Sequence, residues 1–79
     1  MTAMDDYEEG DTILLLLRGV HAATVMREWW EANRACDLRW RRAKTPGHVV
    51  LETTDMMFAA SVVALYRRDI RISIRKKQC

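Results

Sequence analysis

A run of consecutive apolar residues, Ile13 to Leu17, constrains the fold more than any other feature of the chain. No polar residue stands at alternate positions of the run, so a strand made from it is apolar on both faces. Such strands lie in the middle of a sheet, where both sides are covered. Gly19 follows the run and marks a change of direction. Residues 12–18 are therefore predicted to form a central strand.

The next segments show first helical and then strand periodicity. Apolar residues recur at intervals of three and four over residues 20–36, which predicts an amphipathic helix with an exposed Glu31–Arg34 pair. Residues 37–44 and 48–53 have strand patterns and are separated by Pro46 and Gly47. This arrangement predicts a β-hairpin.

The last two elements have the clearest patterns. The segment from Met56 to about Arg68 is densely apolar and follows Thr54 and Asp55, either of which can cap a helix. We expect this helix to be well buried, including its methionine-rich start. Residues 70–75 alternate between isoleucine and a polar residue, which predicts a strand with one buried face and one cationic face.

The predicted order is strand, helix, strand, strand, helix, strand. A chain of 79 residues has room for one hydrophobic core. With right-handed crossovers, this order gives an α+β, ferredoxin-like fold, in which two helices cover one face of a four-stranded antiparallel sheet. The first and third strands are central, and the other two are edges. Residues 12–79 are predicted to form this domain, and residues 1–11 a flexible acidic arm.

Charge is distributed unevenly along the chain. Residues 1–11 contain no Lys or Arg and five carboxylates, namely Asp5, Asp6, Glu8, Glu9 and Asp11. The remaining residues hold thirteen Lys and Arg against six Asp and Glu, a net charge of +7. This asymmetry predicts either a basic surface that binds an anion or an acidic arm that folds back over it.

The arginines are concentrated on the two predicted edge strands. Arg39 and Arg41 share one side of their strand, with Arg42 opposite, while Arg71 and Arg75 alternate with isoleucines. The face without helices should then have an apolar centre and a basic rim, which indicates a partner-binding surface. Charges that only protect the edges from aggregation are the alternative. The predicted partner-binding residues are Arg39, Arg41, Arg42, Lys44, Arg71, Arg75 and Trp30.

No residue pattern indicates catalysis, a metal site or a cofactor. His21 and His48 have no Asp, Cys or Ser at a revealing spacing, and Cys36 and Cys79 form neither a CxxC motif nor a zinc-ligand pattern. A ribonuclease that uses His48 with a nearby arginine is the enzyme alternative. No apolar run approaches the ~20 residues of a membrane-spanning helix. We expect a soluble, cytoplasmic, non-enzymatic protein.

The predicted element order over residues 12–77 resembles the RNA-recognition motif. That resemblance implies a sheet that stacks bases on aromatic side chains of its central strands. The family signature would fall on residues 45–52, where His48 and Val50 stand at aromatic positions and Glu52 follows. The first strand supplies leucines. A nucleic-acid-binding module that uses the basic sheet is therefore an alternative function.

A short single domain with arginine-rich strands, an acidic arm and no catalytic constellation also resembles the small phage-encoded anti-CRISPR proteins. The resemblance is one of size and style. It implies an inhibitor that blocks a CRISPR effector complex and its DNA binding in the cytoplasm of a bacterial host. The carboxylates of the arm would imitate phosphates, and the arginines would pair with acidic protein surface. A homodimeric structural domain is a further alternative.

Overall fold

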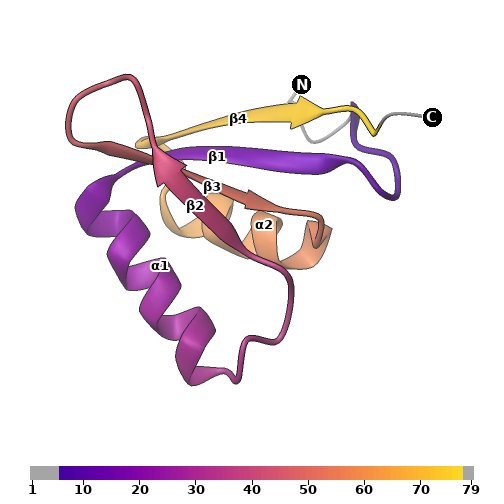
Figure 1. Cartoon of the computed structure of the whole chain (residues 1–79), viewed down its shortest axis with the longest axis horizontal. Coiled ribbons are helices and arrows are strands. Elements are labelled where there is room, and N and C mark those ends of the chain that lie inside the picture. The colour runs from indigo at the N-terminus through magenta and orange to yellow at the C-terminus, as the bar shows by residue number, and fades with distance from the viewer. Residues whose placement is uncertain (1–5, 78–79) are drawn as a thin grey trace.

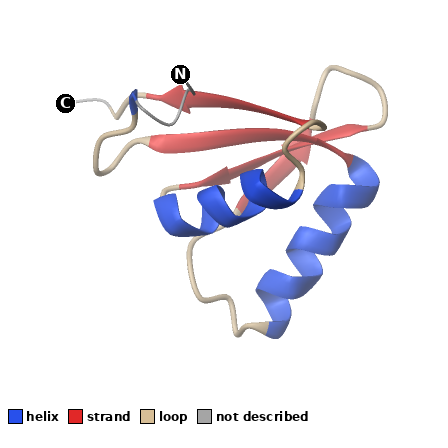
Figure 2. Ribbon diagram, turned by 180° about the vertical axis from the view of Figure 1, so that it is seen from behind, coloured by secondary structure: helices blue, strands red, loops and turns tan. Residues whose placement is uncertain are grey.

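The computed structural model describes residues 6–77 and confirms the ferredoxin-like fold (Figure 1). The elements are β1 (Thr12–Arg18), α1 (Gly19–Glu31), β2 (Arg39–Arg42), β3 (His48–Thr53), α2 (Met56–Leu65) and β4 (Ile70–Arg75). The strands form one antiparallel sheet in the order β2-β3-β1-β4, so β1 and β3 are central, as predicted. Both helices lie on the same side of the sheet (Figure 2). The predicted arm residue Asp5 and the thiol of Cys79 lie outside the described residues.

The register of the sheet divides the apolar run of β1 between two faces. Ile13, Leu15 and Leu17 are fully buried against the helices, whereas Leu14 and Leu16 face the other way and are half-buried. Burial of each such side chain contributes roughly 1.5–3 kcal/mol. The rest of the buried core consists of Ala22, Val25, Leu51, Ala59 and Val62. The core therefore lies between the sheet and the helices, and the opposite face is open.

Helix α1 is shorter than predicted and ends at Glu31. Asn33 and Arg34 have φ angles of 60° and 54°, in the left-handed region that terminates helices. The N–H of Arg34 donates to the carbonyl of Trp29, and the N–H of Asn33 donates to that of Trp30, each at 3.0 Å. Arg34 then lies over the Trp30 ring, 4.8 Å from its centroid. The predicted Glu31–Arg34 pair within the helix is therefore wrong.

The hairpin between β2 and β3 is confirmed, although β2 covers only residues 39–42 of the predicted 37–44. The N–H of His48 donates to the carbonyl of Thr45 at 3.2 Å, and Gly47 has a φ of 75°. Pro46 and Gly47 thus occupy the central positions of a type II turn, the second of which requires a positive φ. The carbonyl of Gly47 also accepts from the N–H of Gly19 at 2.8 Å, which attaches the turn to the start of α1.

Helix α2 has the predicted cap but not the predicted burial. The Asp55 carboxylate accepts from the N–H of Phe58 at 2.9 Å. Met57 and Leu65, however, are 80% and 66% exposed, because only one side of the helix faces the sheet. The expectation of a well-buried helix with a buried methionine-rich start is therefore wrong. Over residues 6–77, neither helix has the length and apolar character needed to cross a membrane.

Candidate functional site

The sheet face without helices collects arginines from both edge strands. In antiparallel strands, directly opposite residues share a face. Arg41 lies opposite Val50, and Arg71 lies opposite Leu16, so both arginines flank the same apolar centre. We call this surface the open face; it comprises Thr12, Leu14, Leu16, Arg18, Arg39, Arg41, His48, Val50, Glu52, Arg71, Ser73 and Arg75.

Glu52 connects the two arginine-bearing edges of the open face. Its carboxylate accepts from Nε of Arg41 at 3.0 Å and from Nη2 of Arg75 at 2.7 Å. The Glu52 side chain is only 13% exposed. Burial acts to raise the pKa of this carboxyl, but the hydrogen bonds from Arg75 and Arg41 outweigh it, so the pKa lies below its ordinary value. Because Arg41 belongs to β2 and Arg75 to β4, the ion pairs extend across the sheet.

A hollow of about 350 Å³ lies at the centre of the open face. Leu14, Leu16 and Val50 line it as apolar residues, and Arg41 and Arg71 line it from the two edges. Val50 is only 8% exposed and the leucines are half-buried, as expected where long arginine stems cover apolar surface. The apolar centre predicted from the sequence is therefore present but narrower than an uncovered sheet face would be.

Two arginines of the open face are free to pair with a partner. Among the ion pairs formed within residues 6–77, none includes Arg39 or Arg71, and both side chains are exposed. Arg71 also lines the hollow. A guanidinium in this state offers a planar set of donors to a carboxylate or a phosphate.

Three of the predicted partner-binding residues lie elsewhere. Arg42 is paired with Val49 and therefore points to the helix side of the sheet. Lys44 lies in the connection between β2 and β3. Trp30 is 63% exposed on α1, on the other side of the sheet from the open face, while its neighbour Trp29 is half-buried. The structure thus brings together only the four arginines at positions 39, 41, 71 and 75.

Asp11 attaches the start of β1 to the residues that follow β4. Its side chain is 1% exposed and accepts from the backbone N–H of Lys77, from Nζ of Lys76 and from the N–H of Glu8, each at 3.0 Å. The N–H of Lys77, followed by the side chain of Lys76, lowers the pKa of Asp11 to about 2. Lys76 in turn has a raised pKa because it donates to Asp11. Sequence patterns gave no signal for this contact.

The described part of the predicted acidic arm lies against the domain, and none of it lines the hollow between Arg41 and Arg71. The hydroxyl of Tyr7 donates to the carbonyl of Thr54 at 2.7 Å, and its ring packs against the core. Nζ of Lys77 donates to the carbonyl of Glu9 at 2.7 Å. The carboxylates of the arm at Asp6, Glu8 and Glu9 belong to exposed residues.

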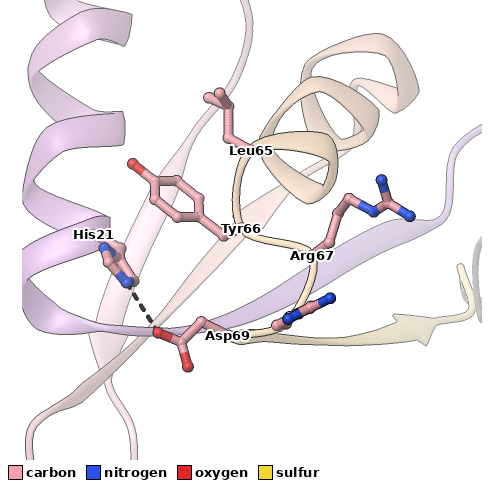
Figure 3. A pocket seen from close by; sticks show the side chains of 6 residues that line it. His21, Leu65, Tyr66, Arg67 and Asp69 are labelled. Carbon is pink, nitrogen blue, oxygen red and sulfur yellow. Dashed lines mark hydrogen bonds and ion pairs between the residues drawn. The ribbon is translucent and has the colours of Figure 1, made fainter.

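A second hollow, of about 750 Å³, lies where α1 begins and α2 ends (Figure 3). Nε2 of His21 is 3.1 Å from Oδ2 of Asp69, and the His21 ring stacks on Tyr66 at 4.4 Å. Nε of Arg18 lies 3.5 Å from the same carboxylate oxygen. Figure 3 shows His21 pointing toward Asp69, while Arg67 points away from that pair. The residues that line this hollow include no serine, threonine or cysteine, and its polar groups are those of His21, Tyr66, Asp69 and two arginines.

His48 lies in the hairpin, and Cys36 is half-buried. Nδ1 of His48 lies 3.0 Å from the carbonyl of Pro46, within the hairpin. Burial raises the pKa of the Cys36 thiol, which keeps it protonated at neutral pH. Within residues 6–77, no three His, Cys, Asp or Glu side chains gather closely enough to hold a metal ion.

The sheet order and the helix placement define the chain as a ferredoxin-like α+β domain. Comparisons of the chain with protein-family models, with curated proteins and with solved structures find no match. A function must therefore be argued from the surface of this domain itself.

Proposed function

We propose that this domain is a non-enzymatic binding protein whose open face holds an acidic protein surface. The observation that carries the proposal is the hollow with an apolar floor between Arg41 and Arg71. An apolar side chain of the partner fits on this floor, and carboxylates beside it pair with the guanidinium groups. The partner segment therefore has an apolar residue flanked by Asp or Glu.

Two features of the open face favour a protein over a nucleic acid. The face has leucines and a valine at its centre and no phenylalanine, tyrosine or tryptophan, so the centre offers bases no aromatic ring on which to stack. Within residues 6–77, the one ring that the register places on this face is the imidazole of His48, at the start of β3 beside the hairpin. The carboxylate of Glu52 also lies between the arginines of the two edges. A phosphate backbone that crosses the face would pass close to this negative charge.

A synthetic peptide with a leucine flanked by glutamates tests the proposal by fluorescence anisotropy. Leu16→Glu places a charge on the floor of the hollow, and Arg71→Glu reverses a guanidinium that has no ion-pair partner within residues 6–77. Arg71→Glu should weaken peptide binding by about tenfold or more, the usual effect of losing a hydrogen-bonded charge. Leu16→Glu should weaken it by a similar factor, because it places an unpaired carboxylate under the apolar side chain of the peptide. Arg27→Glu, an exposed reversal on α1, is the matched control and should leave binding and the circular dichroism spectrum unchanged.

Single-stranded RNA is the second probe, and it tests the main alternative, a nucleic-acid-binding module. The wild type should bind RNA weakly, and Glu52→Gln should strengthen that binding by about two- to fivefold, since it removes one repelling charge at a partly exposed site. Tight RNA binding by the wild type that falls steeply with salt would contradict the proposal and favour a nucleic-acid-binding module. A wild-type dimer that Leu16→Glu dissociates in sedimentation would favour the homodimeric structural domain.

The finer prediction is that the acidic partner belongs to a CRISPR effector complex. It is supported by the size and style of the chain and is tested in a CRISPR-bearing bacterium challenged with a targeted phage. Expression of the wild type should restore plaque formation, and expression of the Arg71→Glu variant should not. Equal plaque numbers with and without the wild-type protein would contradict this prediction and leave the open face as a site for another acidic protein.

A further inference from the structure

We infer that the outer edge of β4 accepts an extended acidic segment of another protein as a fifth strand. β4 is an edge of the sheet, and it pairs with β1 over all six of its residues without a bulge. No other strand within residues 6–77 pairs with its outer side. Every second residue of an edge strand directs its N–H and C=O groups outward, and such groups pair readily with another chain.

A groove follows this edge. It has a volume of about 530 Å³ and is lined on the strand side by three consecutive residues, Ile72, Ser73 and Ile74. Consecutive strand residues point to opposite faces of the sheet, so a hollow that they share runs along the edge rather than over one face. Four residues line the rest of the groove: Asp6, Tyr7 and Glu8 of the arm, and Lys76.

The edge lacks two of the devices that usually prevent strand addition. β4 contains no proline, and its pairing with β1 is continuous. On the helix side, Ile70, Ile72 and Ile74 are only half-buried, so an added strand would cover apolar surface there. On the other side, the charges of the strand are those of Arg71 and Arg75 alone.

These two sides define the chemistry of the partner strand. Side chains directly opposite each other on neighbouring strands lie about 4.5–5.5 Å apart, so their charges interact. A partner that alternates acidic and apolar residues places its carboxylates beside Arg71 and Arg75 and its apolar side chains beside the isoleucines. A second copy of β4 would instead place two more arginines beside a strand that has no carboxylate of its own. The carboxylates that line the groove, those of Asp6 and Glu8, belong to the arm and not to the strand. The charges of β4 itself therefore favour an acidic partner strand over a second copy of β4.

This inference goes beyond the proposed function of the open face, because it depends on backbone hydrogen bonds at the edge and not on the hollow between Arg41 and Arg71. Either can fail without the other. A peptide that binds the open face through its side chains tolerates N-methylation, whereas a peptide that joins the sheet does not.

The test uses a hexapeptide that alternates glutamate with valine, and it measures amide hydrogen exchange of the full chain by NMR. Addition of the peptide should slow the exchange of alternate β4 amides. Alternate N–H groups of the bound peptide face β4, and N-methylation of that set of nitrogens should abolish this protection. A peptide with lysine in place of glutamate should give none.

A pair of substitutions at one exposed site supplies the matched control. Ser73→Glu should weaken binding of the hexapeptide, and Ser73→Lys should strengthen it, each by about two- to fivefold. Peptide binding that protects no β4 amide, equal binding of the N-methylated peptides, or equal binding of the lysine peptide would overturn the inference. Protection of β4 by the protein alone, with a dimer in sedimentation, would assign the edge to a second copy and would also overturn it.

Discussion

Two carboxylates with little solvent exposure connect distant parts of the sheet. Asp11 ties the start of β1 to Lys76 and Lys77, and Glu52 pairs with arginines on both edge strands. No buried side-chain nitrogen or oxygen within residues 6–77 lacks a hydrogen-bond partner. This complete pairing is the condition under which a small core tolerates buried charge. We therefore expect both carboxylates to stabilise the fold in their ionised state.

Asp11→Asn should reduce the acid sensitivity of the domain. The pKa of Asp11 in the fold is about 2, below the value of about 4 for an unfolded chain. The ionised carboxylate therefore stabilises the fold above about pH 4, and this contribution is lost as the pH falls toward 2. Urea unfolding at a series of pH values should show a steeper loss of stability between pH 4 and 2 in the wild type than in the variant.

Glu9→Gln is the control for this titration, because Glu9 is exposed and its carboxylate takes part in none of the ion pairs formed within residues 6–77. It should follow the wild-type curve. The pKa of Glu52 is also below its ordinary value, but Glu52 is present in every variant, so it does not affect the comparison. Parallel curves for the wild type and Asp11→Asn would show that Asp11 does not contribute to acid sensitivity.

At the scale of elements, the helices and the edge strands expose more apolar surface than their patterns predicted. α2 contains no charged residue, yet Met57 and Leu65 on its outer side are exposed. Trp40 of β2 is 58% exposed although it lies opposite the buried Leu51 on the helix side. α1 packs on β1 and β3, so the end of the sheet formed by β2 is left uncovered. Which apolar side chains are buried thus depends on which strands each helix packs against.

The hydrogen bond that caps α2 should stabilise the fold, because the apolar pattern of residues 56–65 does not by itself determine where the helix begins. Asp55→Ala removes the acceptor for the N–H of Phe58 and should destabilise the domain by ~1 kcal/mol. Asp55→Asn keeps a capping oxygen and should remain close to the wild type. Thermal unfolding followed by circular dichroism measures both. Equal losses for alanine and asparagine would mean that the charge of Asp55, and not its hydrogen bond, supports the helix.

At the scale of the whole molecule, residues 7–11 join the first strand to the end of the last one. Tyr7 packs against the core and donates to Thr54, while Asp11 and Glu9 accept from Lys76 and Lys77. The segment predicted to be a flexible acidic arm therefore contributes contacts to the folded domain. None of residues 6–11 lines the hollow between Arg41 and Arg71.

A chain that begins at Thr12 should consequently be less stable than the full chain. Loss of the half-buried Tyr7 ring and its hydroxyl hydrogen bond alone should lower the free energy of unfolding by ~1–2 kcal/mol. Tyr7→Phe, which loses only the hydroxyl, should show the smaller part of this effect. Urea unfolding of the three proteins measures the series. An unchanged midpoint for the truncated chain would mean that residues 1–11 act as an independent arm.

Most of the fold could be predicted because its signals are local. The apolar run of residues 13–17 placed β1 in the centre, Pro46 and Gly47 marked the hairpin, and Thr54 or Asp55 marked the start of α2, where Asp55 is the cap. The alternation along β4 likewise placed Arg71 and Arg75 on one face. Each of these features depends on residues that are close in sequence, where backbone geometry alone fixes which side chains share a face.

The pairings within the candidate sites could not be predicted in this way. Asp11 and Lys76 are 65 positions apart, His21 and Asp69 are 48 apart, and Glu52 and Arg75 are 23 apart. Only the assembled domain brings such residues within hydrogen-bond distance. The register of the sheet does so for Asp11–Lys76 and Glu52–Arg75, and the packing of α1 beside the end of α2 does so for His21–Asp69. The sequence by itself determined the order of the elements and the cationic side of the edge strands. The tertiary structure decided which charges pair, which arginines stay free, and that an apolar hollow lies between them.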